Sequence, residues 1–139
     1  MSSKKQYDKA FTQEKAIYRR TFDGLTEMLD LALIAMDDEH YVISKEILEF
    51  IIENSTSEMT RLEGYQYLME IEIRTASKET YPEIKTKFTN LITTFGDGPK
   101  TFGLQVDYNR FLAFTINDKE NAIQHLKSLS KENLSRYQK

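Results

Sequence analysis

Three segments of the chain share one spacing of apolar and small residues, and this recurrence constrains the fold more than any other feature. The segments begin at Tyr41, Tyr81 and Lys119, so their starts lie 40 and 38 residues apart. At offsets of three, seven and ten residues the segments carry Ser44, Leu48 and Ile51, then Ile84, Phe88 and Leu91, then Ala122, Leu126 and Leu129. Such a period is typical of a unit of helix, turn and second helix that stacks on its neighbours.

The rest of the chain has the same helical character. From Tyr7 to Met36 apolar residues recur mostly three or four positions apart, which is the periodicity of an amphipathic helix. Turn signals interrupt the pattern at 36–40, 76–80 and 95–99, and a break is expected near 21–23. No segment shows sustained strand alternation. The sequence therefore predicts an all-α fold of about seven helices, built as a short α-solenoid of stacked antiparallel helical hairpins, with a compact helical bundle as the alternative.

We expect one all-helical domain over residues 1–139, because a chain of this length can bury about two thirds of its unfolded surface in a single core. Within this domain residues 1–21 form a basic N-terminal helix. Three hairpin units are expected to follow, over residues 22–56, 57–96 and 97–135.

Charge is unevenly distributed along the chain. The formal net charge is −3, but residues 1–21 carry +4, residues 22–79 carry −10 and residues 80–139 carry +3. The favoured interpretation is that the basic first helix packs near the acidic middle of the chain; the alternative is that this helix binds a partner. We do not expect nucleic acid or an anionic membrane as the ligand, because the acidic majority of the surface would repel both.

Composition also bears on location. The chain has no Cys, so no disulfide framework or thiolate metal site is available. It shows neither the apolar core of a secretory signal nor an apolar run of about 18 residues. We therefore expect a cytoplasmic protein without a membrane span.

Two segments, AMDDEHYVISKEILEFIIEN and TINDKENAIQHLKSLSK, resemble the turn and second helix of tetratricopeptide repeats. The likeness rests on the positions of Ala122, Leu126 and Leu129 and, less closely, Ser44, Leu48 and Ile51. The middle segment departs from the family because Ile84 stands where a small residue is preferred. The first helices lack the family's aromatic and Leu-Gly pattern, and the spacing exceeds the usual period of about 34 residues. The resemblance implies stacked helical hairpins with a concave groove, and it implies no chemistry.

A search for catalytic or metal-binding patterns finds none. Neither His40 nor His125 is followed three or four residues later by an acidic residue or a second His, the spacing that would make a metal-binding helix face. There is no GxSxG elbow and no phosphate-binding glycine loop. The acidic stripe of Glu46, Glu49 and Glu53 is typical of a solvated helix face. We expect no enzymatic activity, no cofactor and no metal.

The leading hypothesis is a non-enzymatic protein- or peptide-binding module with a regulatory role, whose groove is lined by the first helix of each hairpin. Candidate groove residues are Arg61, Tyr65, Met69, Asp107, Tyr108, Arg110 and Phe111. The competing interpretation of Tyr65, Met69, Tyr108 and Phe111 is that they belong to the core. The alternative function is a small acidic helical inhibitor or immunity-type protein, bacterial or phage, that covers a basic site on its target. A homodimer is a further hypothesis, since terminal repeats need a cap.

Overall fold

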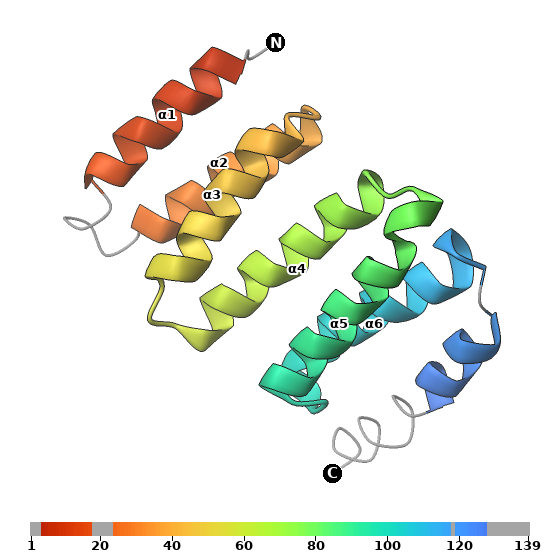
Figure 1. Cartoon of the computed structure of the whole chain (residues 1–139). Coiled ribbons are helices and arrows are strands. Elements are labelled where there is room, and N and C mark those ends of the chain that lie inside the picture. The colour runs from red at the N-terminus through yellow and green to blue at the C-terminus, as the bar shows by residue number, and fades with distance from the viewer. Residues whose placement is uncertain (1–3, 18–23, 118, 128–139) are drawn as a thin grey trace. The chain divides into compact units, whose positions relative to one another are not determined.

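The computed structural model describes residues 4–17, 24–117 and 119–127, and within these ranges it contains helices and turns but no strand (Figure 1). The helices are α1 (Lys4–Ile17), α2 (Gly24–Asp37), α3 (Tyr41–Asn54), α4 (Glu58–Arg74), α5 (Tyr81–Phe95), α6 (Phe102–Arg110) and a seventh over residues 119–127, here called helix 119–127. The predicted all-α class is thus confirmed. None of the helices in the described ranges is long and apolar enough to cross a membrane.

The chain divides into two compact units, residues 1–71 and 72–139, each considered on its own below. The division falls inside α4 and therefore inside the expected second hairpin, 57–96. The predicted break at 21–23 lies outside the described residues.

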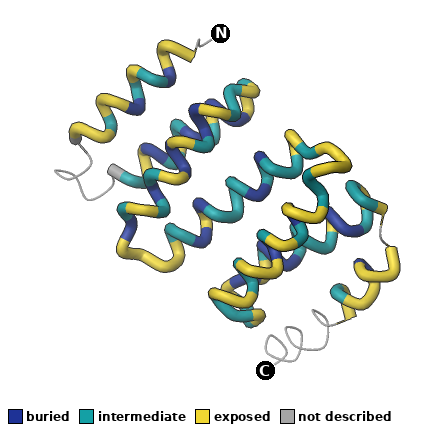
Figure 2. The backbone as a smooth tube through the Cα atoms, in the orientation of Figure 1, coloured by how far each residue is buried: buried dark blue, intermediate teal, exposed yellow. Residues whose placement is uncertain are grey.

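The first unit is built around the hairpin of α2 and α3. Ala32 and Ala35 on α2 and Ser44 on α3 are fully buried, and small side chains allow two helices to approach closely. The Ser44 hydroxyl donates a hydrogen bond of 2.7 Å to the backbone carbonyl of Ala32, which satisfies the one polar side chain at this contact. Figure 2 shows the buried residues along both helices. The turn between them comprises residues 38–40, close to the 36–40 predicted.

Helix α1 packs against this hairpin through its apolar side, as the favoured interpretation predicted. Tyr7 and Phe11 are buried in the core of the unit, while Lys4, Lys5 and Lys9 are exposed. The Tyr7 hydroxyl donates a hydrogen bond of 3.1 Å to the Asp38 carboxylate in the turn after α2. The ring of Phe11 meets the edge of Phe50 on α3 at a centroid distance of 5.7 Å. Apolar contacts and the hydrogen bond between Tyr7 and Asp38 thus help to hold the basic helix on its own chain.

Helix α4 carries a glycine, Gly64, where it packs against α3. A Cβ atom placed on Gly64 would lie 2.8 Å from Cγ1 of Ile52 on α3, closer than packed carbon atoms come. The helix begins after Ser57, whose hydroxyl accepts a hydrogen bond of 3.3 Å from the Thr60 amide, as the side chain of an N-cap residue does. Glycine in the middle of α4 is thus explained by space rather than by helix propensity.

In the second unit, α5 is joined to α6 by a buried polar turn. Helix α5 starts with Pro82 in its first turn and ends at Gly96, whose φ of 95° favours glycine. The buried Thr101 hydroxyl donates to the Gly96 carbonyl. The buried Gln105 amide donates to the Thr101 hydroxyl at 2.7 Å and to the Gly98 carbonyl at 3.1 Å. These bonds satisfy backbone groups that the helix end leaves unpaired.

Helix α6 continues directly into a π-helical turn, η4 (Phe111–Thr115). The backbone amide of Ile116 donates to the carbonyl of Phe111, five residues earlier, which defines the wider turn. Phe111 and Leu112 are both buried, whereas Phe114 is 83% exposed. The turn therefore places an aromatic side chain on the surface directly after two core residues.

Helix 119–127 follows and has only one buried residue in its described part, Ala122 at 4% exposure. Ile123 and Leu126 are each 53% exposed, so this helix is mostly exposed in Figure 2. Of the three packing positions expected here, Ala122 is buried and Leu126 is half exposed. Leu129 lies outside the described residues.

Candidate binding groove

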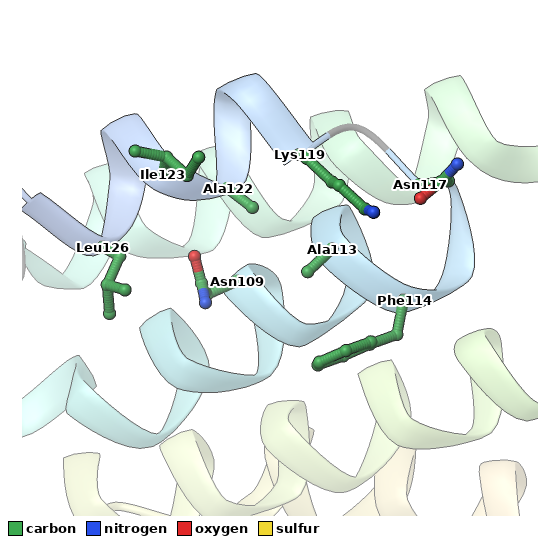
Figure 3. Close-up of a pocket in the computed structure, with 8 residues that line it drawn as sticks. All are labelled: Asn109, Ala113, Phe114, Asn117, Lys119, Ala122, Ile123 and Leu126. Carbon is green, nitrogen blue, oxygen red and sulfur yellow. The ribbon is translucent and has the colours of Figure 1, made fainter.

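An apolar groove lies between the end of α6 with η4 on one side and helix 119–127 on the other, entirely within the second unit (Figure 3). Its volume is about 530 Å³, within the range of sites that hold small ligands or side chains of a bound peptide. Eight residues line it: Asn109, Ala113, Phe114, Asn117, Lys119, Ala122, Ile123 and Leu126.

The shape of the groove follows from the sizes of its lining residues. Ala113 on η4 and Ala122 on helix 119–127 are small, so the two helical segments leave space between them. Phe114, Ile123 and Leu126 carry large apolar side chains and are more than half exposed. A cluster of exposed apolar side chains beside a hollow is the usual sign of a binding surface.

The π-helical turn determines which side chains reach the groove. Phe114 follows Phe111 by three residues, so in a continuous α-helix the two side chains would lie on the same face. The wider turn instead lets Phe111 and Leu112 both enter the core while Ala113 and Phe114 line the groove. Turns of this kind often occur at functional sites.

The polar groups of the groove are few. Lys119 is the one charged residue among the described lining residues, and Figure 3 shows its side chain extending over Ala113. It is exposed and makes no ion pair or hydrogen bond with any residue in the described ranges. Asn117 has a φ of 57°, in the left-handed region that asparagine tolerates, between η4 and helix 119–127.

Beneath the groove lies a buried polar atom without a partner. The side-chain oxygen of Asn109 points toward helix 119–127 (Figure 3) and accepts no hydrogen bond from the described part of the chain. An unsatisfied buried acceptor costs about 1–3 kcal/mol. The loss of solvation of the Asn109 oxygen is therefore not offset by a hydrogen bond from the described part of the chain.

A chain of ring contacts supports the groove from behind. Tyr81 meets Phe111 at a centroid distance of 5.8 Å, and Phe111 lies 6.0 Å from Phe88. Phe88 stacks on Tyr108 at 5.2 Å, and Tyr108 meets His125 on helix 119–127 at 5.1 Å. Burial lowers the pKa of His125 because the charged imidazolium loses solvation there. These rings attach helix 119–127 to α5 and α6.

The seven residues predicted for a groove fall into two sets. Arg61, Tyr65 and Met69 are spaced four residues apart on α4, in the first unit. Met69 is buried, Tyr65 and Arg61 are half-buried, and the Nε atom of Arg61 has no hydrogen-bond partner among the described residues.

The other four predicted residues, Asp107, Tyr108, Arg110 and Phe111, lie on α6 and η4 in the second unit. Phe111 is buried and Tyr108 lies between Phe88 and His125, while Asp107 is half-buried and Arg110 exposed. None of these four lines the apolar groove. That the seven residues form a ligand site stays a prediction.

A smaller hollow in the first unit, of about 380 Å³, is lined by Tyr7, Ile34, Asp37 and Asp38. His40 lies beside it, with its Nε2 atom 3.5 Å from the Asp38 carboxylate and its ring 5.1 Å from that of Tyr7. These contacts fasten α1 to the turn after α2. No group of three or more His, Cys, Asp or Glu side chains within the described ranges is placed to hold a metal ion.

Comparison with known proteins finds no family model, no curated protein and no solved structure that matches this chain. The likeness to tetratricopeptide repeats accordingly remains a resemblance in packing positions.

Proposed function

We propose that this chain is a non-enzymatic protein- or peptide-binding module and that the apolar groove of the second unit is its binding site. The observation that carries the proposal is the groove lining itself. Three large apolar side chains line the hollow together with two alanines, Ala113 and Ala122. The large side chains are those of Phe114, Ile123 and Leu126, and all three are more than half exposed. Among the described lining residues there is no carboxylate, imidazole, thiol or hydroxyl group, so these residues offer apolar contacts and amide hydrogen bonds rather than acid-base or nucleophilic chemistry.

The groove also has the properties that favour binding over simple surface exposure. Scattered apolar residues are normal on protein surfaces, but these three are grouped by two adjacent helical segments. Aromatic anchors such as Phe114 contribute strongly to protein interfaces when a partner buries them.

The experiment is a selection of helical peptides from a display library on the immobilised full chain, followed by titration of the selected peptides. Leu126→Gln removes an apolar groove contact and keeps a residue with good helix propensity. Val42→Gln on α3 is the matched control, because Val42 is 66% exposed and lies in the other unit. We expect about tenfold weaker binding to the Leu126 variant and unchanged binding to the control. Equal binding to both variants would contradict the proposal.

A second candidate function is the acidic inhibitor, which the exposed face of α3 favours. Glu46, Glu49 and Glu53 are exposed and form no ion pair with any residue that the structure describes. A surface of this kind would attract a basic site on a target. Binding through it should weaken steeply as salt increases and should be unaffected by Leu126→Gln, whereas groove binding should be nearly independent of salt.

A further inference from the structure

The apolar surface of helix 119–127 is only partly used inside the chain. Ala122 is buried, while Ile123 and Leu126 remain half exposed and line the groove together with Phe114 of η4. These side chains come from two helical segments that face each other across the groove (Figure 3). A ligand that filled the groove would therefore contact both walls at once.

The backbone of the groove limits how a peptide can bind. Both walls are helical, and no strand occurs within the described ranges, so the groove offers no sheet edge to which an extended peptide could add. An amphipathic helix needs no backbone partner, because its own amides and carbonyls are already paired. It can insert apolar side chains spaced three or four residues apart into a groove of this kind.

The charge of the groove selects among such helices. Lys119 is the charged residue among the described lining residues, and it has no partner in the described parts of the chain. Its side chain extends over the groove toward Ala113 (Figure 3), where it would meet a bound ligand rather than bulk water alone. A carboxylate on the ligand would complement this charge, and a basic ligand residue would be repelled.

We propose that the occupant of the groove is an amphipathic helix of a partner protein that carries a carboxylate side chain beside its apolar stripe. The apolar stripe contacts Phe114, Ile123 and Leu126, and the carboxylate pairs with Lys119. This inference rests on the proposed function and adds the charge and secondary structure of the partner to it.

The test uses three fluorescently labelled, side-chain-stapled helical peptides of about 15 residues, a length at which an unstapled helix is marginal in water. The acidic peptide carries leucines three or four residues apart and a flanking Glu. The basic peptide has Lys in place of that Glu, and the polar peptide has Gln in place of the leucines. Binding to the full chain is measured by fluorescence polarisation. The variants are Lys119→Glu and, as the matched control, Lys127→Glu, an exposed lysine on the same helix outside the groove.

We expect the acidic peptide to bind wild-type protein about threefold to fivefold more tightly than the basic peptide, the range expected for one exposed ion pair. Lys119→Glu should reverse this preference and Lys127→Glu should leave it unchanged. Equal binding of the acidic and basic peptides, with loss of the polar peptide, would overturn the charge assignment and leave the proposed function intact. Binding of the polar peptide as tight as that of the acidic one, or no binding by any peptide, would overturn the proposed function as well. A dimer in light scattering that Phe114→Gln converts to monomer would assign the groove to a second copy of the chain and overturn the inference.

Discussion

The imidazole of His125 meets the ring of Tyr108 edge-on, with centroids 5.1 Å apart and planes at 72°. Tyr108 in turn stacks on Phe88 of α5 at 5.2 Å. Through this pair the helix that forms one wall of the groove is attached to the core of the second unit. The stability of that attachment, and with it the groove, should therefore depend on whether the His125 imidazole is protonated.

Acidification should weaken the second unit through His125. Burial lowers the pKa of this imidazole below the ordinary value of 6.5. The buried Nδ1 atom of His125 forms no hydrogen bond with any of the described residues. His125 therefore binds a proton more weakly in the folded chain than in the unfolded chain. The contribution of neutral His125 is complete above pH 6.5 and is lost as the pH falls below it.

The measurement is urea unfolding of the wild type and of His125→Gln across this pH range, with the imidazole pKa read from its proton resonance. The wild type should lose more stability on acidification than the variant does. An imidazole pKa above 6.5 would show that the burial effect has been misassigned.

Replacement of Asn109 by leucine should leave stability unchanged or raise it. The buried side-chain oxygen of Asn109 has no hydrogen-bond donor in the described structure, and a leucine, whose side chain branches at the same carbon, removes the uncompensated group. We expect a gain of up to about 1 kcal/mol in the free energy of unfolding, measured by urea denaturation. Asn109→Ala is the control for lost volume and should not stabilise. A loss above about 1 kcal/mol for the leucine variant would indicate that a bound water or an unseen donor satisfies the oxygen.

Gly64→Ala should destabilise the first unit although alanine is the better helix former. The added methyl carbon would lie 2.8 Å from Cγ1 of Ile52, so the Ile52 side chain must leave its position or α3 and α4 must move apart. Overpacking of this kind costs about 1–3 kcal/mol, which outweighs the gain of up to about 1 kcal/mol from helix propensity. Thermal unfolding should show the loss.

A double-mutant cycle with Ile52→Ala isolates this contact. Because Ile52→Ala removes the clashing carbon, the double variant should be more stable than the sum of the two single changes predicts. Additive effects would place the cost of Gly64→Ala elsewhere.

Phe11→Ala should release α1 from the α2–α3 hairpin. Phe11 is buried in the core of the first unit against Phe50, and removing such an aromatic side chain costs about 3 kcal/mol. Hydrogen exchange should accelerate across Lys4–Ile17 in the variant. Thr12→Ala on the same helix is the control, because Thr12 is exposed and its hydroxyl bonds only to the carbonyl of Asp8 one turn earlier. Unchanged exchange in Phe11→Ala would mean that α1 is held by other contacts.

Helical periodicity was sufficient to predict the class and most of the helix boundaries. The Gly96 to Pro99 turn could be located because glycine and proline have strong local preferences, and the first unit's buried face at Ser44, Leu48 and Ile51 followed from spacing alone. The close approach at Gly64 was not predicted, because it depends on which helix lies opposite.

The groove was not predicted for a different physical reason. The candidates Tyr108 and Phe111 were chosen as aromatic residues on a helix, but the structure uses both in ring contacts with Phe88. The lining residues Asn109, Ala113 and Phe114 are directed by the π-helical turn, and no local residue preference announces such a turn. The available signal was the excess of apolar residues in FLAF and at Ile123 over what one core face needs.

Whether the apolar groove is the binding site can be tested by mapping where a bound peptide contacts the chain. The measurement is a titration of isotope-labelled full-length protein with a peptide selected from the display library, followed through backbone amide chemical shifts. We expect the largest changes in amide chemical shift at residues 109–126 and no change in α2 and α3. Shifts centred on α3, or spread evenly over both units, would contradict the assignment of the groove as the binding site.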